Sequence, residues 1–280
     1  MSRRAKLLTA VVILIVVLGG SALALSRSSI GAAVFASRGQ FMQSDDNPAV
    51  LYEPGMEREA RLVAAALPEA ISTVEARQCL PIAKPFRVYV CSSQESFNKY
   101  MAAPAGATAR GVKVLNDIFL SPATFSSWRG DTHASVLTHE LSHLHLYQRI
   151  GHRRTLWDVP VWFLEGLAVA VSGGGGEGVS REAVVSAIAA GNHFLPDVRG
   201  SLLRPKRASD YGMETFMFYR QSELFVRFIM ERDPDTFQEF MLALQLGGGL
   251  TFESAFESIF GTSVEGIWSE FKQSLAPAGA

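Results

Sequence analysis

The sequence predicts an α+β fold in which a small half with a mixed or antiparallel sheet is followed by a helical half. Three short runs typical of strands lie between residues 86 and 121, and beyond Asp131 the apolar residues recur at helical spacing. Of the 280 residues, 48% are hydrophobic and 19% are charged, which is typical of a folded chain. This length accommodates one domain of ordinary size behind a leader.

Residues 1–25 have the features of a signal peptide or a transmembrane anchor. Basic residues at positions 3, 4 and 6 precede the apolar stretch Leu7–Leu25, which is long enough to cross a bilayer about 30 Å thick. Because the basic end stays in the cytoplasm, the remaining chain is expected to be exported. The small residues at 22 and 24, in Ala22-Leu23-Ala24, would also suit a signal peptidase. Two outcomes stay open: anchorage at the outer face of the cytoplasmic membrane, and a secreted or periplasmic form.

The polar, aperiodic residues 26–54 predict a tether, and the folded domain is expected over 55–278. A helix is predicted over 55–78, with Pro68 interrupting it or ending its first part. Strands are predicted at 86–91, 109–115 and 117–121, the last two as a hairpin, with a short helix at 94–101. The other predicted helices span 132–150, 160–171, 180–190, 209–232, 234–246, 250–259 and 263–275.

The chain has two cysteines, Cys79 and Cys91, which flank the first predicted strand. An oxidising compartment would allow them to form a disulfide, and the alternative is a pair of buried free thiols. The formal net charge is −1 and no run of like charges occurs. Because nucleic-acid binding needs a basic face, no nucleic-acid partner is expected.

One motif predicts a metal site. Residues 139–143 match the pattern H-E-x-x-H inside a helical stretch that Asp131 or Thr132 can cap. Four residues advance a helix by about 6 Å and about 400°, so His139 and His143 project from one face and can share one tetrahedral ion. Glu140 lies about 100° round the helix, beside the ion, where a base can take a proton from metal-bound water.

Glu165 is the predicted third ligand. It is the only charged residue between Pro160 and Val171. Burying a carboxylate in such an apolar segment costs several kcal/mol, by order of magnitude, unless a cation compensates it. Catalytic zinc takes three protein ligands and keeps one open position, so one Zn²⁺ ion on His139, His143 and Glu165 is expected.

With these motifs the chain resembles the gluzincin metallopeptidases, in particular the peptidase-MA-like family related to aminopeptidases of the leukotriene-hydrolase type. The matching residues are the H-E-x-x-H motif, the segment Trp162-x-x-Glu165-Gly166-x-Ala168, and the segment from Tyr219 to Val226. The resemblance implies a zincin-like catalytic domain with Glu140 as general base and later proton donor. It also implies that Tyr219, with Tyr211 in reserve, stabilises the oxyanion, and that an edge strand near Asp117 to Ser121 pairs with an extended substrate.

Two departures from the family pattern shape the expected activity. The segment Gly-x-Met-Glu-Asn, which grips a free amino terminus in the exopeptidases, has no counterpart upstream of Asp131, so an endopeptidase is favoured over an aminopeptidase. Val169 replaces the aspartate of the thermolysin-like pattern, which leaves Asp158 as the candidate partner of a ligand histidine.

The predicted function is an exported zinc-dependent metallopeptidase that acts on peptides or unfolded proteins. Two alternatives stay open. One is a catalytically idle zinc-containing module that binds extended polypeptides, and the other is a zinc amidase or esterase with a non-peptide substrate.

Overall fold

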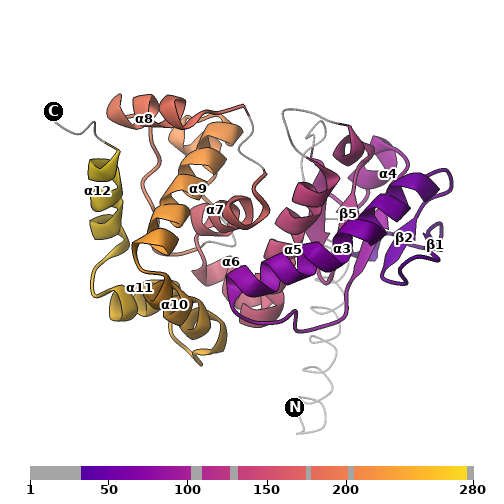
Figure 1. Cartoon of the computed structure of the whole chain (residues 1–280), viewed down its shortest axis with the longest axis horizontal. Coiled ribbons are helices and arrows are strands. Elements are labelled where there is room, and N and C mark those ends of the chain that lie inside the picture. The colour runs from indigo at the N-terminus through magenta and orange to yellow at the C-terminus, as the bar shows by residue number, and fades with distance from the viewer. Residues whose placement is uncertain (1–32, 102–108, 127–131, 175–177, 201–204, 276–280) are drawn as a thin grey trace, which may run out of the picture.

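The computed structural model describes residues 33–101, 109–126, 132–174, 178–200 and 205–275. The predicted leader, residues 1–25, lies outside these residues. Within them the α+β prediction is confirmed: one five-stranded sheet lies in the N-terminal half, and the C-terminal half is helical. Figure 1 shows the sheet with α3 (Glu57–Gln78), α4 (Gln94–Asn98) and α5 (His133–Ile150) on one side of the molecule and the later helices on the other.

The sheet has the strand order β1-β2-β3-β5-β4. Its strands are β1 (Met42–Gln43), β2 (Val50–Tyr52), β3 (Arg87–Val90), β4 (Gly111–Val114) and β5 (Asp117–Leu120). β2, β3 and β5 run parallel, and β1 and β4 are antiparallel to their neighbours. The expectation that 117–121 is the edge strand is therefore wrong. The hairpin turn folds β5 back between β3 and β4, so β4 is the edge.

The predicted tether contributes to this sheet. β1 and β2 both lie within residues 26–54, and Val50 is fully buried where β2 pairs with β3. The amide of Ser44 donates to the carbonyl of Val50 over 2.9 Å, which closes the turn between the two strands. Strands of two and three residues are too short to show an alternating pattern, so periodicity could not predict them.

Helix α3 runs unbroken through Pro68, contrary to the prediction. A proline removes one backbone hydrogen bond and crowds the carbonyl four residues before it, at a cost of about 3 kcal/mol. The preceding turn is made of three alanines, 64–66, and the buried side chains of Val63, Leu67 and Val74 bind the helix to the core. Tertiary packing thus outweighs the local penalty.

The remaining helices follow the predicted order with two differences. α6 (His152–Asp158) was not predicted, and the stretch predicted as one helix over 209–232 is divided at Gly212, which has a φ of 64°. The other elements of this half are α7 (Val161–Ser172), α8 (Arg181–Ala189), the 3-10 turn η2 (Ala208–Tyr211), α9 (Thr215–Arg232), α10 (Pro234–Leu246), α11 (Phe252–Phe260) and α12 (Val264–Ser274). A further 3-10 turn, η1 (Pro122–Phe125), precedes α5.

Each face of the sheet covers a separate core. Val88, Val90 and Ile118 pack against α3 and α5 in a core that continues into the C-terminal helices. Tyr89 and Phe119 point to the opposite face, where they pack with residues of α4 and the chain before β1. The alternation of side chains along a strand therefore decides which residues face α5, the helix that carries the H-E-x-x-H motif.

The disulfide expected between Cys79 and Cys91 is not formed, and both thiols are free. Cys79 ends α3 and packs against the core on the α5 side of the sheet. Cys91 follows β3 and is buried in the core on the other side. The sheet lies between the two side chains, so their sulfur atoms cannot meet. Burial raises the pKa of both thiols, which keeps them protonated.

No single helix among the described residues is long and apolar enough to span a membrane. Taken together, α6 and α7 have the length and apolar composition of a membrane span, but the two helices meet at a bend of 111°.

Candidate metal centre

Helix α5 presents the two predicted histidine ligands from one face. Thr132 caps its amino end: the Thr132 side chain accepts from the amide of Ser135, and the Ser135 side chain accepts from the amide of Thr132. The opposite face, including Leu137 and Leu141, is buried in the core, which fixes the rotation of the helix. The Nε2 atoms of His139 and His143 then lie 3.2 Å apart.

Glu165 comes from α7, whose other side chains are almost all apolar and buried. Its Oε2 atom lies 3.5 Å from Nε2 of His139 and 3.6 Å from Nε2 of His143. Burial alone would raise the pKa of the Glu165 carboxyl, but the two imidazoles, His143 first, outweigh it and lower the pKa. Glu165 is thus an ionised acid held against two imidazoles.

These three atoms fit one tetrahedral cation. Ligands at about 2.0–2.1 Å from a tetrahedral zinc ion are separated from one another by about 3.4 Å. The observed separations of 3.2, 3.5 and 3.6 Å form a nearly equilateral triangle of that size. Among the described residues, these side chains form the one group of three or more His, Cys, Asp or Glu residues that could hold a metal ion.

Glu140 lies beside the triangle and is buried, with 9% of its surface exposed. Burial raises the pKa of its carboxyl, and the negative charge of Glu165 raises it further, against the opposing effect of His139 and His143. Its side chain lies against the edge strand: a Cβ atom placed on Gly111 would be 2.7 Å from Cγ and 3.0 Å from Oε1 of Glu140. The carboxylate therefore occupies space that only a glycine at position 111 leaves free.

Tyr219 is brought to the site by the packing of α9 against α7. A Cβ atom on Gly166 would lie 2.6 Å from the carbonyl oxygen of Ser222, so the glycine after the ligand allows the close approach of the two helices. The Tyr219 ring is 6.5 Å from the His139 ring. The charge of Glu165, then burial and a hydrogen bond to Glu165, raise the pKa of the Tyr219 hydroxyl well above its usual value. The hydroxyl stays a hydrogen-bond donor.

Tyr211 and Asp158, for which the sequence suggested roles at the site, bond to other partners. The Tyr211 hydroxyl donates to Oδ2 of Asp197 over 3.0 Å and contacts the carbonyl of Leu195, so Tyr211 is not a reserve for Tyr219. Asp158 accepts from the amide of Phe252 over 2.9 Å at the start of α11 and pairs with Arg154 at 3.6 Å.

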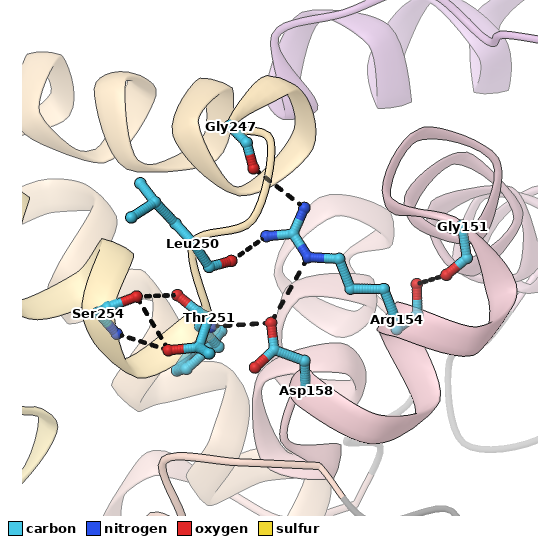
Figure 2. A network of polar contacts seen from close by, with 9 residues as sticks. Gly151, Arg154, Asp158, Gly247, Leu250, Thr251 and Ser254 are labelled. Atoms are coloured by element: carbon cyan, nitrogen blue, oxygen red, sulfur yellow. Dashed lines mark hydrogen bonds and ion pairs between the residues drawn. The ribbon is translucent and has the colours of Figure 1, made fainter.

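Figure 2 shows that Arg154 also reaches the carbonyls of Gly247 and Leu250. The expectation that Asp158 orients a ligand histidine is therefore wrong. Together with Arg154 it joins α6 to the corner between α10 and α11.

Sequence reasoning missed two residues of the edge strand. Lys113 lies two positions after Gly111 and points to the same face of the sheet, toward α5, where its Nζ atom is 3.5 Å from the centre of the Tyr147 ring. Burial lowers the pKa of Lys113 to about 8, although the charge of Glu140 acts in the opposite direction. The alternation of the predicted strand placed 111 and 113 on one face, but the sequence alone did not show that this face meets α5.

Comparison with known proteins adds no assignment. No protein-family model matches the chain, and no curated protein matches it.

Proposed function

We propose that this protein is an exported zinc-dependent metallopeptidase, favoured as an endopeptidase, that hydrolyses peptide bonds in extended polypeptides. The observation that carries the proposal is the triangle of donor atoms on His139, His143 and Glu165, which has the size that one tetrahedral zinc ion requires. Glu140 and Tyr219 beside that triangle supply the two further groups that hydrolysis needs. Export is inferred from the leader in the sequence.

When bound, zinc would supply a Lewis acid that makes a water molecule acidic near neutral pH and polarises a carbonyl group. Glu140 accepts the proton that the attacking water loses, and it returns the proton to the leaving amine. Tyr219 donates a hydrogen bond to the carbonyl oxygen as negative charge develops on it, a contribution of about 3–4 kcal/mol in comparable sites.

The edge strand gives the substrate a place to lie. In the β4–β5 hairpin, Val114 pairs with Asp117 next to a two-residue turn, so Val114 and Val112 direct their backbone groups toward β5. Gly111 and Lys113 therefore direct their N–H and C=O groups to the outer side of β4, where no strand of the described residues pairs and an extended peptide can add as a sixth strand. Such a peptide would pass Glu140, which touches Gly111.

A direct test uses the purified protein with its zinc content measured. Wild type is expected to hold one zinc per chain and to digest casein. Glu140→Ala should keep the zinc and lose roughly 10²–10⁴-fold in rate, and Tyr219→Phe should lose roughly 10²–10³-fold. Tyr211→Phe is the matched control, because that hydroxyl is bonded to Asp197. The proposal fails if Glu140→Ala cleaves as fast as wild type, or if the zinc-loaded protein cleaves no peptide.

A further inference from the structure

Lys113 on β4 carries a positive charge that the proposed mechanism leaves unused. Among the residues that the structure describes, its ammonium group has no hydrogen-bond acceptor and no carboxylate within ion-pair distance, and it lies 3.5 Å from the centre of the Tyr147 ring. Tyr147 lies on α5, one helical turn beyond His143, and burial, together with the charge of Glu165, raises the pKa of its hydroxyl. The ammonium is therefore held over a residue one helical turn beyond a candidate metal ligand, and its three N–H donors have no acceptor among the described residues.

No neighbouring side chain among the described residues forms an ion pair with Lys113. Glu140 on α5 is the acidic neighbour that acts on it, and the Glu140 carboxylate lies against Gly111, one side-chain position away along the strand. From α6, His152 faces the same region, where the charge of Lys113 contributes to lowering the pKa of its imidazole. His152 contacts the carbonyl of Leu115 instead. A cation held in a partly desolvated position without a paired acid is costly, so a ligand that brings the acid would be favoured.

The backbone of β4 fixes where that acid would come from. Lys113 directs its N–H and C=O to the free edge, so a peptide residue that pairs with them lies directly opposite, with its side chain on the same face of the extended sheet. Directly opposed side chains have Cβ atoms about 4.5–5.5 Å apart, and opposite charges at such positions attract. The peptide residue facing Gly111, beside Glu140, is two positions along the same peptide.

We propose that Lys113 makes the edge strand β4 select peptides that carry a carboxylate opposite it, two positions from the residue that faces Gly111. This inference rests on the proposed function and names its substrate class: an acidic side chain at that position or, if the peptide ends there, its terminal carboxylate. The same charge disfavours a free amino terminus at that position, because two ammonium groups repel each other.

The test compares cleavage sites. Zinc-loaded wild type, Lys113→Met, Lys113→Arg and Lys113→Glu digest one denatured protein mixture, and the cleaved bonds are mapped by mass spectrometry. Lys99→Met is the matched control, since it removes the same charge from the residue that follows α4, a helix on the opposite face of the sheet. Wild type, Lys113→Arg and Lys99→Met should show Asp and Glu enriched at one position near the cleaved bond. Lys113→Met should lose the enrichment, and Lys113→Glu should replace it with Lys and Arg.

A pair of synthetic peptides that differ only in Glu or Gln at the enriched position then measures the effect. Wild type should prefer the Glu peptide by about ten- to a hundredfold in kcat/KM, as a charged hydrogen bond allows, and Lys113→Met should not discriminate. Versions with a free and an amidated carboxyl terminus separate a side-chain carboxylate from a terminal one. Cleavage without an acidic preference, or with one that Lys113→Met and Lys113→Glu leave unchanged, would overturn the inference while the peptidase proposal stands.

A binding measurement keeps the two proposals separable if no cleavage occurs. Zinc-loaded Glu140→Ala, with and without Lys113→Met, is titrated with two fluorescent random octapeptide pools, acetylated and amidated, whose fixed fourth residue is Glu or Gln. Tighter binding of the Glu pool that Lys113→Met abolishes supports the inference even for a protein that does not cleave. Equal binding of the two pools refutes it.

Discussion

Replacing Gly111 by alanine tests whether the edge strand sets the position of the proposed general base. A Cβ atom at position 111 would lie 2.7 Å from Cγ and 3.1 Å from Cδ of Glu140, whereas ordinary contacts begin at 3.4 Å. Glu140 would have to retreat by about 0.7 Å if the strand did not yield. A misplacement near 1 Å in a catalytic group can cost about 10²-fold in rate. We expect kcat to fall by roughly that factor, with one zinc ion still bound.

The assay measures kcat and KM on one cleaved peptide together with zinc content and thermal stability. Zinc should be retained because the three atoms nearest to the new Cβ all belong to Glu140, which is not one of the candidate ligands. Gly39→Ala is the matched control: its added Cβ would have only the Ser37 hydroxyl nearby, at an ordinary 3.6 Å.

A double-mutant cycle separates displacement of Glu140 from a general loss of structure. Glu140→Asp shortens the side chain by one methylene and removes the crowded position, so Gly111→Ala should cost much less in the Glu140→Asp background than in wild type. Equal costs in both backgrounds, or a wild-type kcat in Gly111→Ala, would show that the steric argument is wrong.

Three further perturbations address the metal, the helix contact and the cation. Glu165→Ala should weaken zinc binding by about a hundredfold or more in a chelator competition, since even outer partners of zinc ligands are worth about 10–100-fold; an unchanged affinity would exclude Glu165 as a ligand. Gly166→Ala should destabilise the fold by about 1–3 kcal/mol in denaturant unfolding and slow cleavage, because the new Cβ would lie 2.6 Å from the Ser222 carbonyl oxygen and push α9 and Tyr219 away; unchanged stability would show that the helices yield freely. The preference for Glu over Gln peptides should be full near neutral pH and should fall as the pH rises through and above about 8, the pKa of Lys113, because only the protonated amine attracts a carboxylate. Lys113→Arg should keep the preference to higher pH, and a wild-type preference that persists unchanged at pH 10 would count against Lys113 as its source.

The three side chains of the candidate metal centre could be predicted because each depends on local rules. The spacing of His139 and His143 fixes their relation through helix geometry alone, and Glu165 is marked by being the lone charge in an apolar helix. The order of helices after Asp131 followed from apolar periodicity in the same way. What local patterns could not supply was the pairing of distant segments. β1 and β2 are too short to carry a period, and the register that makes β4 the edge depends on β3, which lies about 20 residues earlier.

Sequence reasoning missed the two residues of β4 for the same reason that it misjudged Asp158 and the cysteines: each depends on which distant segments come into contact. Gly111 and Lys113 contact Glu140 and Tyr147 only because the strand lies across α5. Asp158 has a structural role only because α11 begins beside α6, where the amide of Phe252 donates to it. The consequence for the chemistry is specific. In the proposed mechanism, the helices α5 and α7 hold the ion, whereas β4 places the base and supplies the charge that meets the substrate. We therefore expect that a chain with the same two metal motifs and a different edge strand would bind the same ion and select different peptides.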